Sequence, residues 1–158
     1  MEQAKLNKIL ENHKLWLKTG GQEGERADLS SVDLRYANLR SADLRYADLS
    51  YANLRYANLS SADLSYADLS YADLRYADLS YADLDYSTFP LWCGGLDVHI
   101  DDKQATQLLY HLVRNVKYSK NTSKAIKKIC RIKSLVKQAN QFHRVDECGE
   151  IESEVDTE

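Results

Sequence analysis

The sequence predicts a β-solenoid, a coil of short straight sides stacked on one another, and one dominant repeat carries this prediction. From Ala27 the chain reads ADLSS VDLRY ANLRS ADLRY ADLSY ANLRY ANLSS ADLSY ADLSY ADLRY ADLSY ADLDY STFPL. A large apolar residue recurs at every fifth position, and alanine stands two positions before it except at Val32 and Ser87. A period of five fits neither the helical stripe nor strand alternation, but it fits a coil with a corner every five residues. The predicted inward-facing core is Leu29, Leu34, Leu39, Leu44, Leu49, Leu54, Leu59, Leu64, Leu69, Leu74, Leu79, Leu84 and Phe89.

This A(D/N)LXX repeat resembles that of the pentapeptide-repeat family, and the resemblance covers residues 27–89. It implies a right-handed quadrilateral β-helix with about four repeats in each coil, and therefore about three coils. Neighbouring coils would lie about 4.8 Å apart, which gives a shaft about 15 Å long. Some members of the family resemble duplex DNA in shape and charge and act on DNA topoisomerases, so the resemblance also implies a DNA-mimic function as an alternative.

Both ends of a short solenoid expose unpaired backbone and an open leucine core, so caps are expected. Residues 2–18 have the pattern of an amphipathic helix that ends at Gly20 and Gly21. Its apolar stripe would consist of Leu6, Ile9, Leu10, His13 and Leu17. At the other end Pro90 breaks the repeat.

The residues after Pro90 predict a helical C-terminal segment. One helix would begin at Asp101 or Asp102, and its apolar stripe would be Leu108, Leu109, Leu112, Val113 and Val116. Thr122 or Ser123 would cap a second helix that extends to Phe142, with a break near Lys133 and Ser134. The predicted division is a capping helix and linker over 1–25, a repeat domain over 26–90, a basic helical domain over 91–144, and a disordered acidic tail over 145–158.

Charge is distributed unevenly along the chain. Arg26 to Phe89 contains ten aspartates and six arginines, residues 103–144 contain eleven basic residues and no acid, and residues 145–158 contain seven acids and no base. Eleven cations without an acid are typical of a nucleic-acid or anionic surface contact, with Lys124, Lys127, Lys128 and Arg131 as candidates. The cations could equally pair with the acidic tail or lie against the acidic shaft.

The outward residues form columns, since residues twenty apart stack when four repeats make one coil. Two neighbouring columns are Arg35, Arg55 and Arg75, and Tyr36, Tyr56 and Tyr76. One interpretation is a ligand stripe in which guanidinium groups bind phosphate or carboxylate and the rings stack. The alternative is that duplication copied these residues, and that Arg35 and Arg75 pair with Asp33 and Asp73.

Nothing in the sequence favours an enzyme, a cofactor or a metal site. The histidines are scattered, Cys93 has no base nearby, and no catalytic or metal-ligand spacing occurs. Three cysteines far apart argue against a disulfide framework, and no signal peptide or long apolar run occurs, so we expect a cytoplasmic protein. The predicted function is a non-enzymatic bacterial or phage protein-interaction scaffold with an unidentified protein partner. The alternative is a nucleic-acid-linked regulator, and dimerisation through residues 103–118 is left open.

Overall fold

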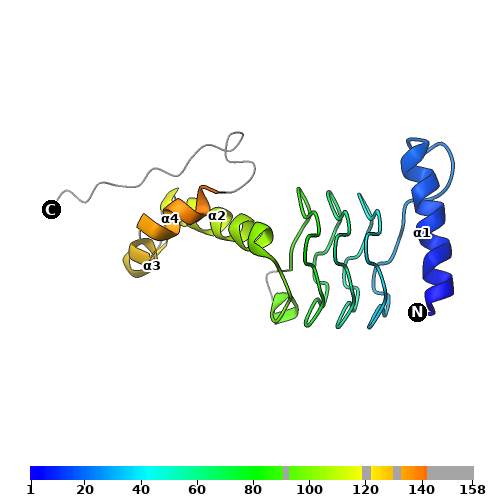
Figure 1. The fold of residues 1–158 in the computed structure, drawn as a ribbon, viewed down its shortest axis with the longest axis horizontal. Helices are drawn as coiled ribbons and strands as arrows, with labels where there is room; N and C mark the ends of the chain where they lie inside the picture. The colour runs from blue at the N-terminus through cyan, green and yellow to red at the C-terminus, as the bar shows by residue number, and fades with distance from the viewer. Residues whose placement is uncertain (91–92, 119–121, 130–132, 142–158) are drawn as a thin grey trace. The chain divides into compact units, whose positions relative to one another are not determined.

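The computed structural model describes residues 1–90, 93–118, 122–129 and 133–141 (Figure 1). The chain divides into two compact units, Met1–Asp101 and Asp102–Glu158. The first contains helix α1 (Gln3–Lys18) and the 3-10 helix η1 (Cys93–Gly95), with stacked coils between them. The second contains helices α2 (Asp102–Tyr118), α3 (Lys124–Ile129) and α4 (Lys133–Ala139). No helix within the described ranges is long and apolar enough to cross a membrane.

The repeats stack as coils of twenty residues, which is four repeats to a coil. Isolated parallel bridges join residues twenty apart, for example Asp28 to Asp48 and Asp48 to Asp68. At each contact the leucine N–H of one coil donates to the coil that follows it, as Leu29 N does to Asp48 O (2.8 Å). The Asp or Asn N–H donates back, as Asp48 N does to Ala27 O (3.0 Å). The described residues pair through such single bridges and form no longer strand.

Leucine and alanine fill the interior of the coils. All leucines from Leu29 to Leu79 are at most 1% exposed, whereas Leu84, near the C-terminal end of the stack, is 8% exposed. Phe89 is half-buried and packs against this cluster. One large and one small side chain from every side therefore fill the interior of the coils.

Helix α1 covers the N-terminal end of the coil stack (Figure 1). Leu6 is buried in the same cluster as the repeat leucines, and Ile9 and Leu10 pack against it. The helix ends as predicted, because Gly20 and Gly21 have the positive φ angles (62° and 87°) that a helix C-terminus requires. This packing removes the first leucines from water.

At the C-terminal end the coil pairing continues beyond Pro90, where the repeat pattern stops. Leu74 N donates to Gly94 O (2.6 Å), Tyr76 N to Asp97 O (2.9 Å) and Leu79 N to His99 O (2.8 Å). The bridge from Asp78 to His99 spans twenty-one residues instead of twenty. This segment pairs through its backbone, so the A(D/N)LXX pattern is not needed there.

The second unit has a small core of its own. Tyr110, Val113 and Val116 of α2 pack with Val136 and Ala139 of α4. The predicted stripe of α2 was partly wrong, because Leu108 and Leu112 are exposed while Tyr110 is buried. The helix turns this face inward because α4 packs against it.

Ser123 is confirmed as the residue that caps the N-terminus of α3. Its carbonyl accepts from Lys127 N (3.1 Å), and its hydroxyl accepts from Ile126 N (3.4 Å). Phe142, the predicted end of the last helix, and the acidic tail over 145–158 lie outside the described residues.

Candidate functional site

Each corner of the coil is a tight turn that points one side chain into solvent. The N–H after the turn donates to the leucine carbonyl before it, as Ala37 N does to Leu34 O (3.0 Å). Twelve corner residues, from Ser31 to Tyr86, have φ between 55° and 63°. This is the position of a type II turn that favours glycine or asparagine, yet nine of the twelve are tyrosines. The turn geometry therefore fixes where the exposed tyrosines lie.

The corner tyrosines stack into ladders along the coil axis. In the first ladder, Tyr56 lies between Tyr36 (5.1 Å between ring centroids) and Tyr76 (4.9 Å). A second ladder consists of Tyr46, Tyr66 and Tyr86, with spacings of 4.9 and 4.6 Å, and Tyr51 stacks on Tyr71 at 4.8 Å. These spacings equal the distance between neighbouring coils. Tyr36 is 72% exposed and Tyr56 42%, so the ring edges of the first ladder remain accessible.

Two of the three arginines beside the first ladder are neutralised. Arg35 binds Asp33 through a two-pronged ion pair (Nη2 to Oδ2 2.7 Å), and Arg75 binds Asp73 in the same way (2.6 Å). The pairing predicted from the sequence is confirmed. Hydrogen bonds from Arg35 lower the pKa of the Asp33 carboxyl to about 2, and those from Arg75 lower the pKa of Asp73.

Arg55, between them, has no such partner. The residue two positions before it is Asn53, whose Oδ1 accepts from the Arg55 backbone N–H (3.3 Å) and carries no charge. Arg55 makes no ion pair with any described residue. Its guanidinium carbon lies 5.7 Å from the Tyr56 ring centre, in the range of a cation–π contact. Of the ligand stripe predicted from the sequence, Arg55 is therefore the one arginine available to a ligand, beside the three rings of the first ladder.

The acidic columns on other sides of the coil are less neutralised. Arg45 bridges Asp43 (2.8 Å) and Asp63 (3.6 Å). Asp28 and Asp48 instead accept hydrogen bonds from the serines that follow them, at 2.7 and 2.6 Å from the hydroxyl groups. The serine bonds lower the pKa of Asp28. The repeat unit therefore presents acidic sides as well as the side with Arg55.

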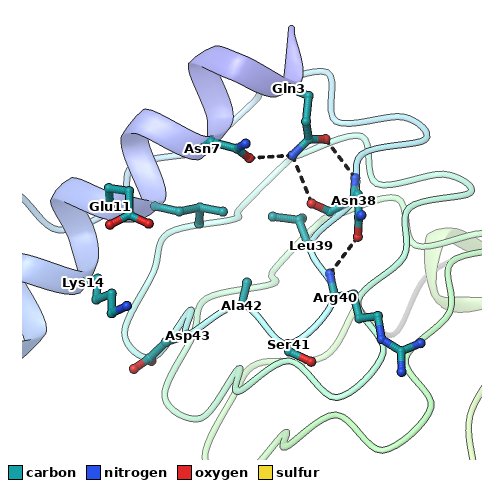
Figure 2. A pocket seen from close by; sticks show the side chains of 11 residues that line it. Gln3, Asn7, Glu11, Lys14, Asn38, Leu39, Arg40, Ser41, Ala42 and Asp43 are labelled. Carbon is teal, nitrogen blue, oxygen red and sulfur yellow. Dashed lines mark hydrogen bonds between the residues drawn. The ribbon is translucent and has the colours of Figure 1, made fainter.

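A pocket of about 420 Å³ lies between α1 and the first coil (Figure 2). Helix α1 contributes Gln3, Asn7, Leu10, Glu11 and Lys14, and the coil contributes residues 38–43. Figure 2 shows the Gln3 carboxamide between Asn7 and the backbone of Asn38. The sequence did not point to this pocket, because its two walls are separated by more than twenty residues and meet only in the fold.

The basic candidates lie in the second unit. Lys128 is exposed and Lys127 half-buried on α3, but the side chain of Lys124 and the whole of Arg131 lie outside what the structure describes. Across the described ranges, no group of three or more His, Cys, Asp or Glu side chains could hold a metal ion. Cys93 is a free, exposed thiol.

Stacked coils with a repeating apolar core make this chain a solenoid repeat protein. The family model for pentapeptide repeats matches residues 25–59 and 52–89, with eight copies. Residues 25–89 of the chain therefore belong to the pentapeptide-repeat family. No curated protein sequence matches it.

Solved structures of pentapeptide repeat proteins resemble part of the chain. HetL from the cyanobacterium Nostoc sp. strain PCC 7120, involved in heterocyst differentiation regulation, is 35% identical over 49% of this chain and 35% of its own (TM-score 0.40). A protein from the cyanobacterium Cyanothece 51142 is 34% identical over 48% of this chain and 51% of its own (TM-score 0.35). A protein of the Arabidopsis thaliana thylakoid lumen is 27% identical over 60% of this chain and 85% of its own (TM-score 0.31). The chain spans a third to a half of the length of the two cyanobacterial proteins.

Proposed function

We propose that this chain is a non-enzymatic protein-interaction module of a bacterial or phage cytoplasm, and that the ladder of Tyr36, Tyr56 and Tyr76 with Arg55 contacts the partner. The observation that carries the proposal is one charged group left unpaired among three stacked, exposed rings. In the proposed architecture the coils form a right-handed four-sided β-helix over residues 26–90. Residues 1–25 cap it, residues 91–144 form the basic helical domain, and residues 145–158 form the acidic tail.

The ladder has the physical properties of an interface anchor. Tyrosine and arginine are enriched in protein interfaces because they combine a large contact area with directed polar groups. Here the turn backbone and the neighbouring rings already hold Tyr56, so binding would order few additional side chains. A rigid aromatic surface of this kind supports binding to a folded or extended protein segment.

Charge indicates which partner segment would fit this ladder. Arg55 is an unpaired guanidinium, and guanidinium groups pair best with carboxylate or phosphate in a two-pronged geometry. Nucleic acid needs many phosphate contacts for affinity, whereas this ladder offers one free cation flanked by two neutralised ones. An acidic side chain of a partner protein is therefore the better match.

The Asn53→Asp substitution tests the proposal without removing Arg55. Asp already occupies the equivalent position before Arg35 and Arg75, so the substitution should pair Arg55 internally and leave the coil intact. The measurement is affinity capture from nuclease-treated bacterial lysate, read by quantitative mass spectrometry. We expect one protein that the unmodified chain enriches to be reduced at least about fivefold by Asn53→Asp, which corresponds to about 1 kcal/mol.

Replacing all three ladder tyrosines by serine, the residue found at other corners, should reduce the same protein further. Tyr81→Ser is the matched control, because Tyr81 is an exposed corner tyrosine outside this ladder. If Asn53→Asp and the triple serine variant both capture the protein as well as the unmodified chain does, the ladder is not the contact surface.

The basic helices support a second candidate function, nucleic-acid binding. Helices α2, α3 and α4 contain eight lysines and arginines and a single acid, Asp102. Direct binding predicts affinity for a duplex DNA probe that falls steeply with salt and is lost when Lys127 and Lys128 are replaced by glutamine. A DNA mimic would instead show no DNA affinity and would compete with DNA for an enzyme. A protein-interaction module would neither bind the DNA probe nor compete with DNA for an enzyme.

A further inference from the structure

The N-terminal edge of the coil stack carries backbone groups that a preceding coil would otherwise pair. Within the stack, the N–H of each Asp or Asn donates to the coil before it and its carbonyl accepts from that coil. Asn58 N donates to Ala37 O (2.9 Å) and Asn58 O accepts from Leu39 N (2.8 Å). The first coil has no coil before it, so the corresponding groups of its own Asp and Asn residues have no preceding coil to pair with.

At Asn38 one side chain of α1 replaces the missing coil. Asn38 N donates to Gln3 Oε1 (3.1 Å), and Gln3 Nε2 donates to Asn38 O (3.1 Å). Gln3 Nε2 also donates to Asn7 Oδ1 (2.8 Å), which fixes the carboxamide in this position (Figure 2). A primary carboxamide therefore satisfies the N–H and C=O of one residue of this edge.

Asp43, one repeat further along, presents the same pair of groups without such a partner. Its equivalent in the next coil, Asp63, donates from N to Ala42 O (3.0 Å) and accepts at O from Leu44 N (2.8 Å), so the Asp43 N–H and C=O point toward α1. No described residue makes a hydrogen bond with the Asp43 backbone N–H or carbonyl. Its carboxylate is engaged elsewhere, with Arg45 (2.8 Å).

These two groups lie at the pocket between α1 and the first coil. Leu10, Leu39 and Ala42 give the pocket apolar walls, and Glu11 and Lys14 belong to its α1 wall (Figure 2). Its volume of about 420 Å³ lies within the range of small-ligand sites. The pocket thus combines an apolar lining with one donor and one acceptor in the arrangement that binds Gln3 at Asn38.

We propose that this pocket is a carboxamide-binding site, in which the Asp43 N–H donates to the ligand carbonyl and the Asp43 carbonyl accepts from the ligand NH₂. The ligand places its apolar stem against Leu10 and Leu39. It is the amide of a glutamine side chain of a partner or of a small molecule, since both offer the same group. The site is separate from the tyrosine ladders, and neither depends on the other.

Titration of the ¹⁵N-labelled full-length chain tests this site by NMR. The first probe is N-acetylglutamine methylamide, which represents a glutamine side chain, and the second is benzamide, which represents a small-molecule carboxamide. The control probe is N-acetylmethionine methylamide, which has a similar shape but cannot make the two hydrogen bonds. We expect a saturable downfield shift of the Asp43 amide proton, with at least about tenfold weaker binding of the methionine compound.

Two helix variants separate the pocket from other surfaces. Glu11→Phe places a large side chain in the pocket wall and should abolish the shift, whereas Lys8→Phe adds the same group to an exposed position of α1 outside the pocket and should retain it. If only one of the two amides shifts the Asp43 signal, the site is supported, and that amide shows whether the ligand is a glutamine side chain or a small molecule. Equal affinity for the methionine compound, a shift that Glu11→Phe leaves unchanged, or no saturable shift of Asp43 would overturn the proposal.

Discussion

Tyrosine occupies a backbone conformation in this coil that tyrosine rarely adopts. A positive φ costs an L-residue roughly 1–2 kcal/mol, because Cβ approaches the following carbonyl, and nine tyrosines have φ near 60°. Stacking of neighbouring rings contributes about 0.5–1.5 kcal/mol for each pair and opposes this strain. The strain at a corner tyrosine is therefore offset only where another ring stacks on it.

Asparagine substitutions at two corners separate strain from stacking. Tyr81 is 77% exposed and stacks on no ring among the described residues, so Tyr81→Asn should raise the free energy of unfolding by up to about 1 kcal/mol. Tyr66 stacks on Tyr46 and on Tyr86, so Tyr66→Asn loses two ring contacts and should be at least about 1 kcal/mol less stable than Tyr81→Asn. Urea unfolding curves measure both values. Equal effects of the two substitutions would show that stacking does not stabilise the coil.

Helix α1 is held to the first coil by a buried histidine. His13 is fully buried, and its Nδ1 accepts a hydrogen bond from Ala27 N–H (3.0 Å). The proton of the neutral ring therefore lies on Nε2, which is buried and has no hydrogen-bond partner in the described part of the chain. Burial lowers the pKa of His13, and this effect exceeds the opposite influence of the Arg45 backbone and of Asp43. Protonation of Nδ1 would also remove the acceptor that Ala27 needs.

This arrangement predicts that acid weakens the attachment of α1. The pKa of His13 is lower in the folded chain than in the unfolded chain, where it is about 6.5. The stabilisation is therefore complete above about pH 6.5 and is lost progressively as the pH falls below that value. Unfolding free energies measured between about pH 7.5 and pH 5 should decline more steeply for the unmodified chain than for His13→Gln, which cannot titrate but retains an acceptor. Identical pH dependence in the two proteins would assign the decline to other groups.

For the molecule as a whole, the repeat determined what could be predicted and what could not. The leucine period predicts the buried core, because every coil uses the same residue for the same purpose. The ion pairs of Arg35 and Arg75 were also predictable, since Asp stands two positions before each. The same comparison would have set Arg55 apart from Arg35 and Arg75 in its column, because Asn53 has no charge to pair with it. It would also have pointed to Arg40, which follows Asn38 in the same way.

Features that depend on backbone pairing left no such pattern. Residues Gly94 to His99 pair with the preceding coil through main-chain groups, which any sequence can supply. The stack of coils therefore extends beyond the last repeat of the sequence. The proposed site in the pocket beside α1 likewise depends on main-chain groups, the N–H and carbonyl of Asp43. In α2, the apolar residues surround more of the helix than one face, and only the packing of α4 decides that Tyr110 is inside and Leu112 outside.

The position of the C-terminal edge leads to a prediction for the whole chain. The leucine core lies entirely within Met1–Asp101, and the core of the second unit contains no residue from it. A fragment of residues 1–101 should therefore fold alone, with amide NMR signals that match those of the full-length chain. A fragment of residues 1–90 should be less stable, because it lacks the carbonyls of Gly94 and His99 and exposes unpaired N–H groups of Leu74 and Leu79 at an open edge.

Thermal unfolding and size-exclusion chromatography compare the two fragments directly. Loss of two or more edge hydrogen bonds, at about 0.5–1.5 kcal/mol each, should lower the melting temperature by several degrees and promote association through the open edge. Equal melting temperatures would show that the pairing beyond Pro90 adds no stability and that the repeats alone complete the fold. Unfolding of the 1–101 fragment would show instead that the first unit requires the second.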